Sequence, residues 1–262
     1  MNFAVIGHPI AHSFSPFLHQ VNFKENNDDH RYTSIDVNPD DIKYIRGITK
    51  MHELSGFNVT VPHKETIMPY LDEIDESAHT IGAVNTVKIV DGKYIGYNTD
   101  VSGYRHSYID AFSDDFKRVL ILGAGGASKA VLNAHLSLGH DVTIVARRKS
   151  SFNDFKDKEF KTHLLGEAYD KSFDVIVNAT PLGLQKEDAF NAFNLEQVVH
   201  DDTIGMDLIY NPEITPFMTH FNIYKNGLDM LIGQAMDAYE IWTDKKGNRE
   251  AVKAAFIERE NL

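Results

Sequence analysis

An apolar run that ends in a cluster of glycines constrains the fold of this chain more than any other feature. Residues 119–122 read Val-Leu-Ile-Leu and predict a buried parallel strand, and Gly123, Gly125 and Gly126 follow directly. Glycine permits a sharp turn and lets the backbone approach a phosphate oxygen with no Cβ in the way. The next pattern predicts a helix over residues 127–138, whose N-terminal N–H groups and dipole favour an anion. Strand, glycine turn and helix together predict a dinucleotide-binding unit.

The strand expected over residues 141–146 indicates which dinucleotide binds. An NAD-binding unit carries an acidic residue about 20 residues beyond the glycines, where it binds the ribose 2′-hydroxyl. This chain has Arg147, Arg148 and Lys149 there, and cationic side chains suit a 2′-phosphate, so the sequence favours NADP over NAD. The alternative is a basic helix cap or a solvated turn. Ser128 replaces the third glycine of the fingerprint and is small enough for close helix–strand packing.

Composition narrows the class of protein. The 262 residues suit two domains, 42% of them are apolar, and no window is long and apolar enough for a membrane span. The first residues read as a strand and not as a signal peptide, so we expect a cytoplasmic location. The absence of cysteine excludes disulfides, thiolate nucleophiles and cysteine-ligated metals. A formal charge of −12 weighs against a nucleic-acid partner, and the 13 histidines lack metal-ligand spacing, so we expect no metal.

Strands and helices alternate along the chain, which predicts an α/β protein of two domains. In the first part we expect strands over residues 2–7, 32–36, 56–61, 83–90 and 93–97, and helices over residues 16–26, 40–49, 64–71 and 101–112. Ser15 is the expected N-cap of the first helix. From residue 116, apolar runs at 118–122, 141–146, 160–164, 173–179 and 203–209 predict a doubly wound parallel sheet. We expect the last helices, over 228–242 and 248–260, to pack back on the first domain.

Short polar segments at the ends of the expected strands carry groups that a small polar ligand needs. They contain Ser13, Ser15, Thr60, Lys64, Asn85 and Asp100. The two serine hydroxyls can hold a carboxylate, or Ser15 can simply cap a helix. Lys64 follows the carboxyl end of a strand, the edge at which open α/β sheets bind ligands, although most lysines are solvated. Each residue alone is equally consistent with a structural role.

Taken in order, eight segments resemble the shikimate dehydrogenase family, and the resemblance covers nearly the whole chain. They are Gly7-His-Pro-Ile with Ser13-x-Ser15-Pro16, Asn58-Val-Thr-Val-Pro-His-Lys64, Gly82-Ala-Val-Asn-Thr86, Asn98-Thr-Asp100, Gly123-Ala-Gly-Gly-Ala127, Asn178-Ala-Thr-Pro-Leu-Gly183, Asp207-x-x-Tyr210-x-Pro212-x-x-Thr215-Pro216 and Gly227-Leu-Asp-Met-Leu-x-x-Gln234. The resemblance implies reversible, NADPH-dependent reduction of 3-dehydroshikimate to shikimate, a step of aromatic amino acid and chorismate biosynthesis. It also implies an α/β substrate domain with a mixed sheet over residues 1–101 and 228–262, and a Rossmann NADP-binding domain over residues 102–227.

The resemblance assigns roles to particular residues. Lys64 and Asp100 match the family's catalytic pair. Ser13 and Ser15 are implied to bind the substrate carboxylate, and Thr60, Asn85 and Gln234 the ring hydroxyls, with Tyr210 nearby. On the cofactor side the implied residues are Gly123, Ala124, Gly125, Gly126 and Ala127 for the diphosphate, Arg147 and Arg148 for the 2′-phosphate, and Thr180, Leu208 and Gly227 for the two ends of the nucleotide.

The sequence departs from the family pattern at three places and leaves alternatives open. The family commonly has Asn-Arg-Thr where this chain has Ala146-Arg147-Arg148, glycine in place of Val101, and asparagine in place of Gln20. The rival enzyme is a quinate/shikimate dehydrogenase with relaxed cofactor use. The rival from another class is a catalytically silent NADP-binding regulatory protein, because a fold does not fix a function. A monomer and a homodimer are both consistent with the sequence.

Overall fold

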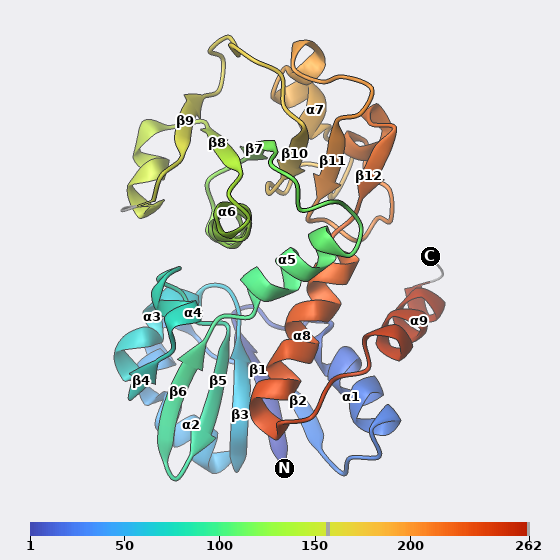
Figure 1. The fold of residues 1–262 in the computed structure, drawn as a ribbon. Helices are drawn as coiled ribbons and strands as arrows, with labels where there is room; N and C mark the ends of the chain where they lie inside the picture. The colour runs from blue at the N-terminus through green and yellow to red at the C-terminus, as the bar shows by residue number, and fades with distance from the viewer. Residues whose placement is uncertain (156–157, 261–262) are drawn as a thin grey trace. The chain divides into compact units, whose positions relative to one another are not determined.

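The computed structural model describes residues 1–155 and 158–260 as an α/β protein (Figure 1). The chain divides into two compact units, one of residues 1–103 and 232–262 and one of residues 104–231. The first unit thus ends at residue 103 where the sequence suggests 101, and resumes at 232 where it suggests 228. Helices Asp100–Ile109 (α5) and Leu228–Thr243 (α8) carry the chain from one unit to the other. In the described residues no helix has the length and apolar character needed to cross a membrane.

The first unit is built on the mixed sheet that the sequence predicts. Its strand order is β2-β1-β3-β5-β6-β4. The strands are Asn2–Gly7 (β1), Arg31–Asp36 (β2), Leu54–Val59 (β3), Glu73–Ile74 (β4), Thr86–Val90 (β5) and Lys93–Tyr97 (β6). Strand β1 pairs in parallel with β2 and β3, whereas β5 is antiparallel to β3 and β6. Because β1 and β3 end at the same edge, their following loops meet, and His8 N donates to Val61 O at 3.0 Å.

Helices cover both faces of this sheet (Figure 1). Alternate residues of β1 face opposite sides. Phe3 and Val5 pack in a cluster with side chains of Ser15–Glu25 (α1) and α8, while Ala4 and Ile6 pack on the other face. The elements on that second face are Pro39–Tyr44 (η1), Ile45–Met51 (α2), Met68–Tyr70 (η2) and Glu76–His79 (α4), and the short helix His63–Thr66 (α3) packs on η1 and η2. Arg249–Glu260 (α9) packs on α1, as expected for the end of the chain.

The second unit contains an all-parallel sheet of order β12-β11-β10-β7-β8-β9. Its strands are Arg118–Leu122 (β7), Asp141–Ala146 (β8), Lys161–Leu164 (β9), Val175–Asn178 (β10), Ile204–Asp207 (β11) and Ile223–Lys225 (β12). This is the doubly wound order of nucleotide-binding sheets. The strands are flanked by Gly126–Ser137 (α6), Lys149–Phe155 (η3), Ala189–Ala192 (α7), Leu195–Gln197 (η4) and Phe217–His220 (η5). The predicted Rossmann-type fold is confirmed.

Several predicted boundaries were wrong for local reasons. Strand β5 begins at Thr86 and not at residue 83, because residues 83–85 form a loop in which Val84 N donates to Lys64 O at 2.8 Å. Strand β3 spans Leu54–Val59 where residues 56–61 are predicted. Ser15 is not the N-cap of α1: the cap position is Phe14, and Ser15 is the first helical residue, whose N–H donates to Ser13 Oγ at 3.3 Å.

Candidate active site

The first unit brings together the two residues predicted to be catalytic. Lys64 lies on the short helix α3, and Asp100 is the first residue of α5. Lys64 Nζ donates to Asp100 Oδ2 at 2.5 Å, and the two side chains are only 28% and 17% exposed. A carboxylate at this distance holds the ammonium in one place and leaves part of it open to a ligand. The sequence-based pairing of these residues therefore has a geometric basis.

Asn85 fixes the second oxygen of the same carboxylate. Its Nδ2 donates to Asp100 Oδ1 at 2.9 Å and to Thr99 Oγ1 at 3.0 Å. Its Oδ1 accepts from the Thr99 backbone N–H at 2.8 Å. Asn98 adds a further contact, because its Oδ1 accepts from Asp100 N at 3.0 Å at the start of α5. Asp100 is therefore held from its backbone and from both carboxylate oxygens.

The loops after β1 and β3 carry the other predicted substrate residues of this unit. Thr60 follows β3, and its backbone N–H donates to Ile6 O at 2.9 Å. A Cβ at Gly7 would lie 2.6 Å from Thr60 Cγ2, so glycine is needed there for the loops to approach. Ser13 and Ser15 are half-buried at the start of α1. These side chains lie at the carboxyl edge of the parallel strands, as the sequence predicts.

The Ser13 loop is also tied to the next strand. Asp36, the last residue of β2, lies 2.6 Å from His8 Nδ1 and accepts from Ile10 N at 3.2 Å. The hydrogen bond from His8, together with that N–H, lowers the pKa of Asp36 from its usual value. Sequence reasoning missed Asp36, since a lone acidic residue at a strand end carries no motif.

The predicted substrate residues Gln234 and Tyr210 lie in different units. Gln234 lies on α8 in the first unit, and its backbone carbonyl accepts from Thr99 Oγ1 at 2.9 Å, beside Asp100. A Cβ at Gly233 would lie 3.1 Å from the Gly103 Cα, so small residues let α8 and α5 approach closely. Tyr210 follows β11 and belongs to the second unit. Its predicted role near the substrate stays a prediction.

The glycine loop of the second unit has the predicted geometry. Gly123 has φ +93°, and a Cβ there would lie 2.8 Å from Thr180 Cγ2. Gly125, Gly126 and Ala127 are exposed at the N-terminus of α6, where backbone N–H groups favour an anion. Ala124 lies between them, half-buried. This donor set fits a diphosphate.

Ser128 does more than permit close packing. Its hydroxyl donates to Gly123 O at 2.8 Å and accepts from Gly125 N at 3.2 Å. The side chain is fully buried and closes the glycine turn from inside. Its place in the fingerprint was visible in the sequence, but its role in holding the loop was not.

The remaining predicted cofactor residues lie at the same sheet edge. Register pairs Leu122 with Asn178 and Asn178 with Asp207, so the residues after these three strands are neighbours. Leu208 and Thr180 each follow one of these strands. Gly227 lies against Leu208, because a Cβ there would be 2.1 Å from the Leu208 carbonyl oxygen. Arg147 and Arg148 are exposed directly after β8, free to meet a phosphate.

Asp207 organises this edge from inside the unit. The carboxylate is fully buried, and it accepts from Thr215 Oγ1 at 2.6 Å and from Asn178 Nδ2 at 3.0 Å. Burial raises its pKa, although these hydrogen bonds and that from Ile209 N oppose the effect. Asn178 Oδ1 in turn accepts from Thr180 Oγ1 at 2.6 Å. One buried carboxylate thus links the loops that carry Thr180 and Leu208.

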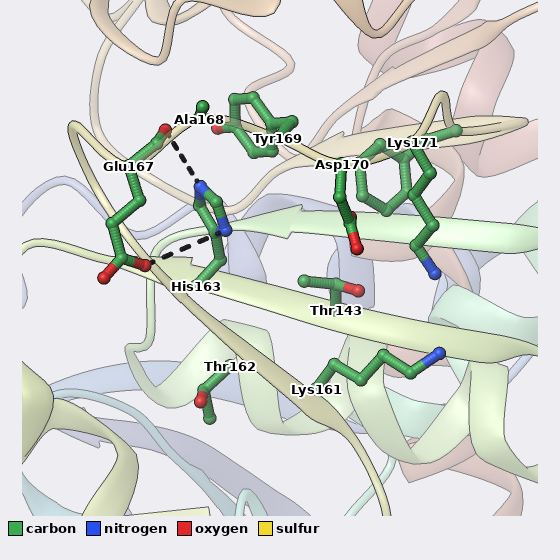
Figure 2. A pocket seen from close by; sticks show the side chains of 10 residues that line it. Thr143, Lys161, Thr162, His163, Glu167, Ala168, Tyr169, Asp170 and Lys171 are labelled. Atoms are coloured by element: carbon green, nitrogen blue, oxygen red, sulfur yellow. Dashed lines mark hydrogen bonds and ion pairs between the residues drawn. The ribbon is translucent and has the colours of Figure 1, made fainter.

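A cavity of about 510 Å³ lies elsewhere in the second unit, over β8 and β9 (Figure 2). None of the predicted site residues lines it. Its lysines, Lys161 and Lys171, each donate to Asp141 at 2.8 Å, and the His163 ring contacts Glu167 and stacks on Tyr169. Both lysines of the cavity therefore already have a carboxylate partner. In the residues that the structure describes, no group of three or more His, Asp or Glu side chains is placed to hold a metal ion.

Three features together define the class of dinucleotide-dependent oxidoreductases: a Rossmann-type sheet, an anion-binding glycine loop, and a lysine held by a carboxylate. The model of a shikimate dehydrogenase substrate binding domain matches residues 5–87, and that of a shikimate 5′-dehydrogenase C-terminal domain matches residues 227–255. The chain is 40% identical to the NADP(+) shikimate dehydrogenase of Staphylococcus haemolyticus over 99% of this chain and 98% of that protein. The chain belongs to the shikimate dehydrogenase family.

Solved structures agree with this assignment. A shikimate 5-dehydrogenase from Thermus thermophilus, in complex with NADP(H) and shikimate, superimposes with a TM-score of 0.85 at 28% identity and covers 100% of both chains. A 5-ketofructose reductase of Gluconobacter superimposes with a TM-score of 0.84 at 30% identity, over 99% of this chain and 98% of that chain. The fold therefore occurs with more than one named substrate.

Proposed function

We propose that this chain is an NADP-dependent shikimate dehydrogenase that reversibly reduces 3-dehydroshikimate to shikimate. The observation that carries the proposal is the 2.5 Å contact between Lys64 and Asp100 in a chain 40% identical to a named NADP(+) shikimate dehydrogenase. The enzyme is thus an oxidoreductase that acts on a secondary alcohol, and NADP is its cofactor.

The chemistry of the pair suits ketone reduction. NADPH, when bound, supplies the hydride. As the ketone becomes an alcohol, negative charge develops on its oxygen, and the Lys64 ammonium stabilises that charge and is placed to supply the proton. In the reverse direction the lysine receives the proton. Asp100 holds the ammonium and offers its carboxylate to a neighbouring ring hydroxyl.

We further propose that the first unit binds the substrate and the second binds NADP. Ser13 and Ser15 hold the carboxylate, and Thr60, Asn85 and Gln234 contact the ring hydroxyls; Tyr210 is also assigned to the substrate. The glycine loop binds the diphosphate, Arg147 and Arg148 bind the 2′-phosphate, and Thr180, Leu208 and Gly227 flank the nucleotide ends. The exposed glycines at the N-terminus of α6 and the exposed arginines support this division.

A substrate panel crossed with both cofactors tests the function. Shikimate with NADP⁺ should give rising absorbance at the reduced-nicotinamide band, with weaker signals for quinate or for NAD⁺. NADPH oxidation with 5-ketofructose tests the substrate of the Gluconobacter relative. Folded protein that gives no change with shikimate and NADP⁺ would contradict the proposal and favour a silent NADP-binding protein.

Location and assembly belong to the same proposal. The small, charged ligands suit an aqueous compartment, and we propose the cytoplasm as the site of action. Cell fractionation tests this, and recovery of the protein outside the cytoplasmic fraction would contradict it. Light scattering after size-exclusion chromatography distinguishes a monomer from a homodimer.

A further inference from the structure

Three polar side chains lie buried in the first unit behind the Lys64–Asp100 pair. They are Tyr32 on β2, Asn58 on β3 and Thr86 on β5, with exposures of 2%, 6% and 0%. Asn58 and Thr86 are cross-strand partners in the sheet register. Buried polar groups cost free energy unless they are hydrogen-bonded, so their bonding pattern has to be explained.

The pattern runs in one direction toward Asn85. Tyr32 OH donates to Asn58 Oδ1 at 2.6 Å, and Asn58 Nδ2 donates to Thr86 Oγ1 at 3.0 Å. Because the Thr86 oxygen accepts from Asn58, its single proton is directed onward, and it donates to Asn85 Oδ1 at 3.0 Å.

This direction agrees with the way the Asn85 amide faces. Its Oδ1 receives protons from Thr86 and from the Thr99 backbone N–H, so its Nδ2 must face Asp100 Oδ1, 2.9 Å away. An inverted amide would set its oxygen against the carboxylate and its NH₂ against the Thr99 N–H. We propose that Tyr32, Asn58 and Thr86 form a positioning relay that fixes the Asn85 amide and, through it, the carboxylate that holds Lys64.

The relay begins at Tyr32, whose pKa burial raises well above its usual value. Tyr32 is therefore held as a neutral donor. The inference rests on the proposed function, because the relay acts through Asp100 on the reaction.

Thr86→Val tests the relay, because valine keeps the shape and removes the hydroxyl. The change should lower kcat with shikimate roughly 10- to 100-fold, as small misplacements of reacting groups do, with a much smaller change in KM. Thr86→Ser, which restores the hydroxyl, should return kcat to within a few-fold of the parent.

The same unit offers a matched control. Thr49 is 1% exposed, and its hydroxyl lies 2.6 Å from Tyr94 OH in a pair remote from the relay. Thr49→Val also removes a buried threonine hydroxyl, so it should lower the melting temperature comparably and leave kcat unchanged. If Thr86→Val does not fold, Tyr32→Phe against Tyr94→Phe makes the same comparison.

The outcomes separate the relay from the proposed function. A parent enzyme without shikimate activity contradicts the function. With an active parent, the relay is overturned if Thr86→Val keeps kcat within twofold, or if Thr49→Val reduces kcat equally. A kcat loss confined to the relay variants, with rescue by serine, supports it.

Discussion

Lys64 is the side chain on which the proposed reaction depends most. Its ammonium is held by Asp100 at 2.5 Å on a helix of only four residues. Lys64→Ala should lower kcat by roughly two orders of magnitude or more, because a positioned charge and proton donor is lost. Steady-state kinetics with shikimate and NADP⁺ measure this. Lys88→Ala is the control, since Lys88 pairs with Asp244 in the same unit, and near-normal turnover of Lys64→Ala would refute the assigned role.

Arg147 is expected to recognise the 2′-phosphate of the cofactor. Arg147→Ala should raise KM for NADP⁺ by roughly tenfold, the loss of one charged hydrogen bond, and leave KM for shikimate nearly unchanged. NAD⁺ provides an internal control, because it lacks this phosphate and its KM should not rise. An unaltered KM for NADP⁺ would show that other groups hold the phosphate.

Candidate site residues differ in how visible they are in a sequence. Lys64, Asn85 and Asp100 stand in motifs at strand or helix ends, so residue type and the family pattern predicted their meeting. Asn58 and Thr86 lie on neighbouring strands, and nothing in their spacing indicates that the two side chains meet. The available signal was an asparagine inside a strand, a residue that strands disfavour.

Secondary-structure elements were predicted well where apolar runs are long and poorly where they are short. Strands β7 and β8 were predicted within a residue because each is a continuous apolar run before a clear turn. The two-residue β4 and three-residue β12 were missed, since such short strands form by pairing with neighbours and have no pattern of their own. Helix α4 was also missed, because its four residues are too few to show a helical pattern in the sequence.

Gly227 packs closely against the backbone of Leu208 in the second unit. A Cβ at Gly227 would lie 2.1 Å from the Leu208 carbonyl oxygen, a backbone atom that cannot rotate away. Gly227→Ala should therefore lower the free energy of unfolding by about 1–3 kcal/mol through overpacking. Urea denaturation measures this.

Gly47→Ala is the matched control, because Gly47 lies in helix α2 with nothing within 4 Å of its Cβ position. It should stabilise the protein by up to about 1 kcal/mol, as alanine favours helix. Equal stabilities of the two variants would contradict the close contact.

The whole molecule should lose stability in mild acid. Burial lowers the pKa of His19 in the first unit to about 3, and burial with the neighbouring His140 lowers that of His135 in the second unit to about 3. Above pH 6.5 these groups are neutral in both states. Below it the unfolded chain binds protons that the folded chain does not, so stability falls by up to about 1.4 kcal/mol per pH unit for each group.

Urea midpoints between pH 7.5 and 5 measure this effect. His135→Gln should flatten the dependence, whereas His52→Gln, at an exposed position, should not. A midpoint that stays constant from pH 7.5 to 5 would contradict the buried, neutral histidines.

The sequence predicted two units because the glycine loop and the apolar runs from residue 116 follow the pattern of a doubly wound sheet, separate from the strands before them. The return of α8 and α9 to the first unit followed from their being too few to form a domain. The sequence does not indicate the oligomeric state, since no apolar stripe stands out beyond those that the two cores need.

A crystal structure with shikimate and NADP⁺ both bound tests the role of Lys64. A ring oxygen of shikimate should lie within about 3.2 Å of Lys64 Nζ, with Asp100 contacting an adjacent hydroxyl. Shikimate bound where the Lys64 amine cannot reach it would contradict this role.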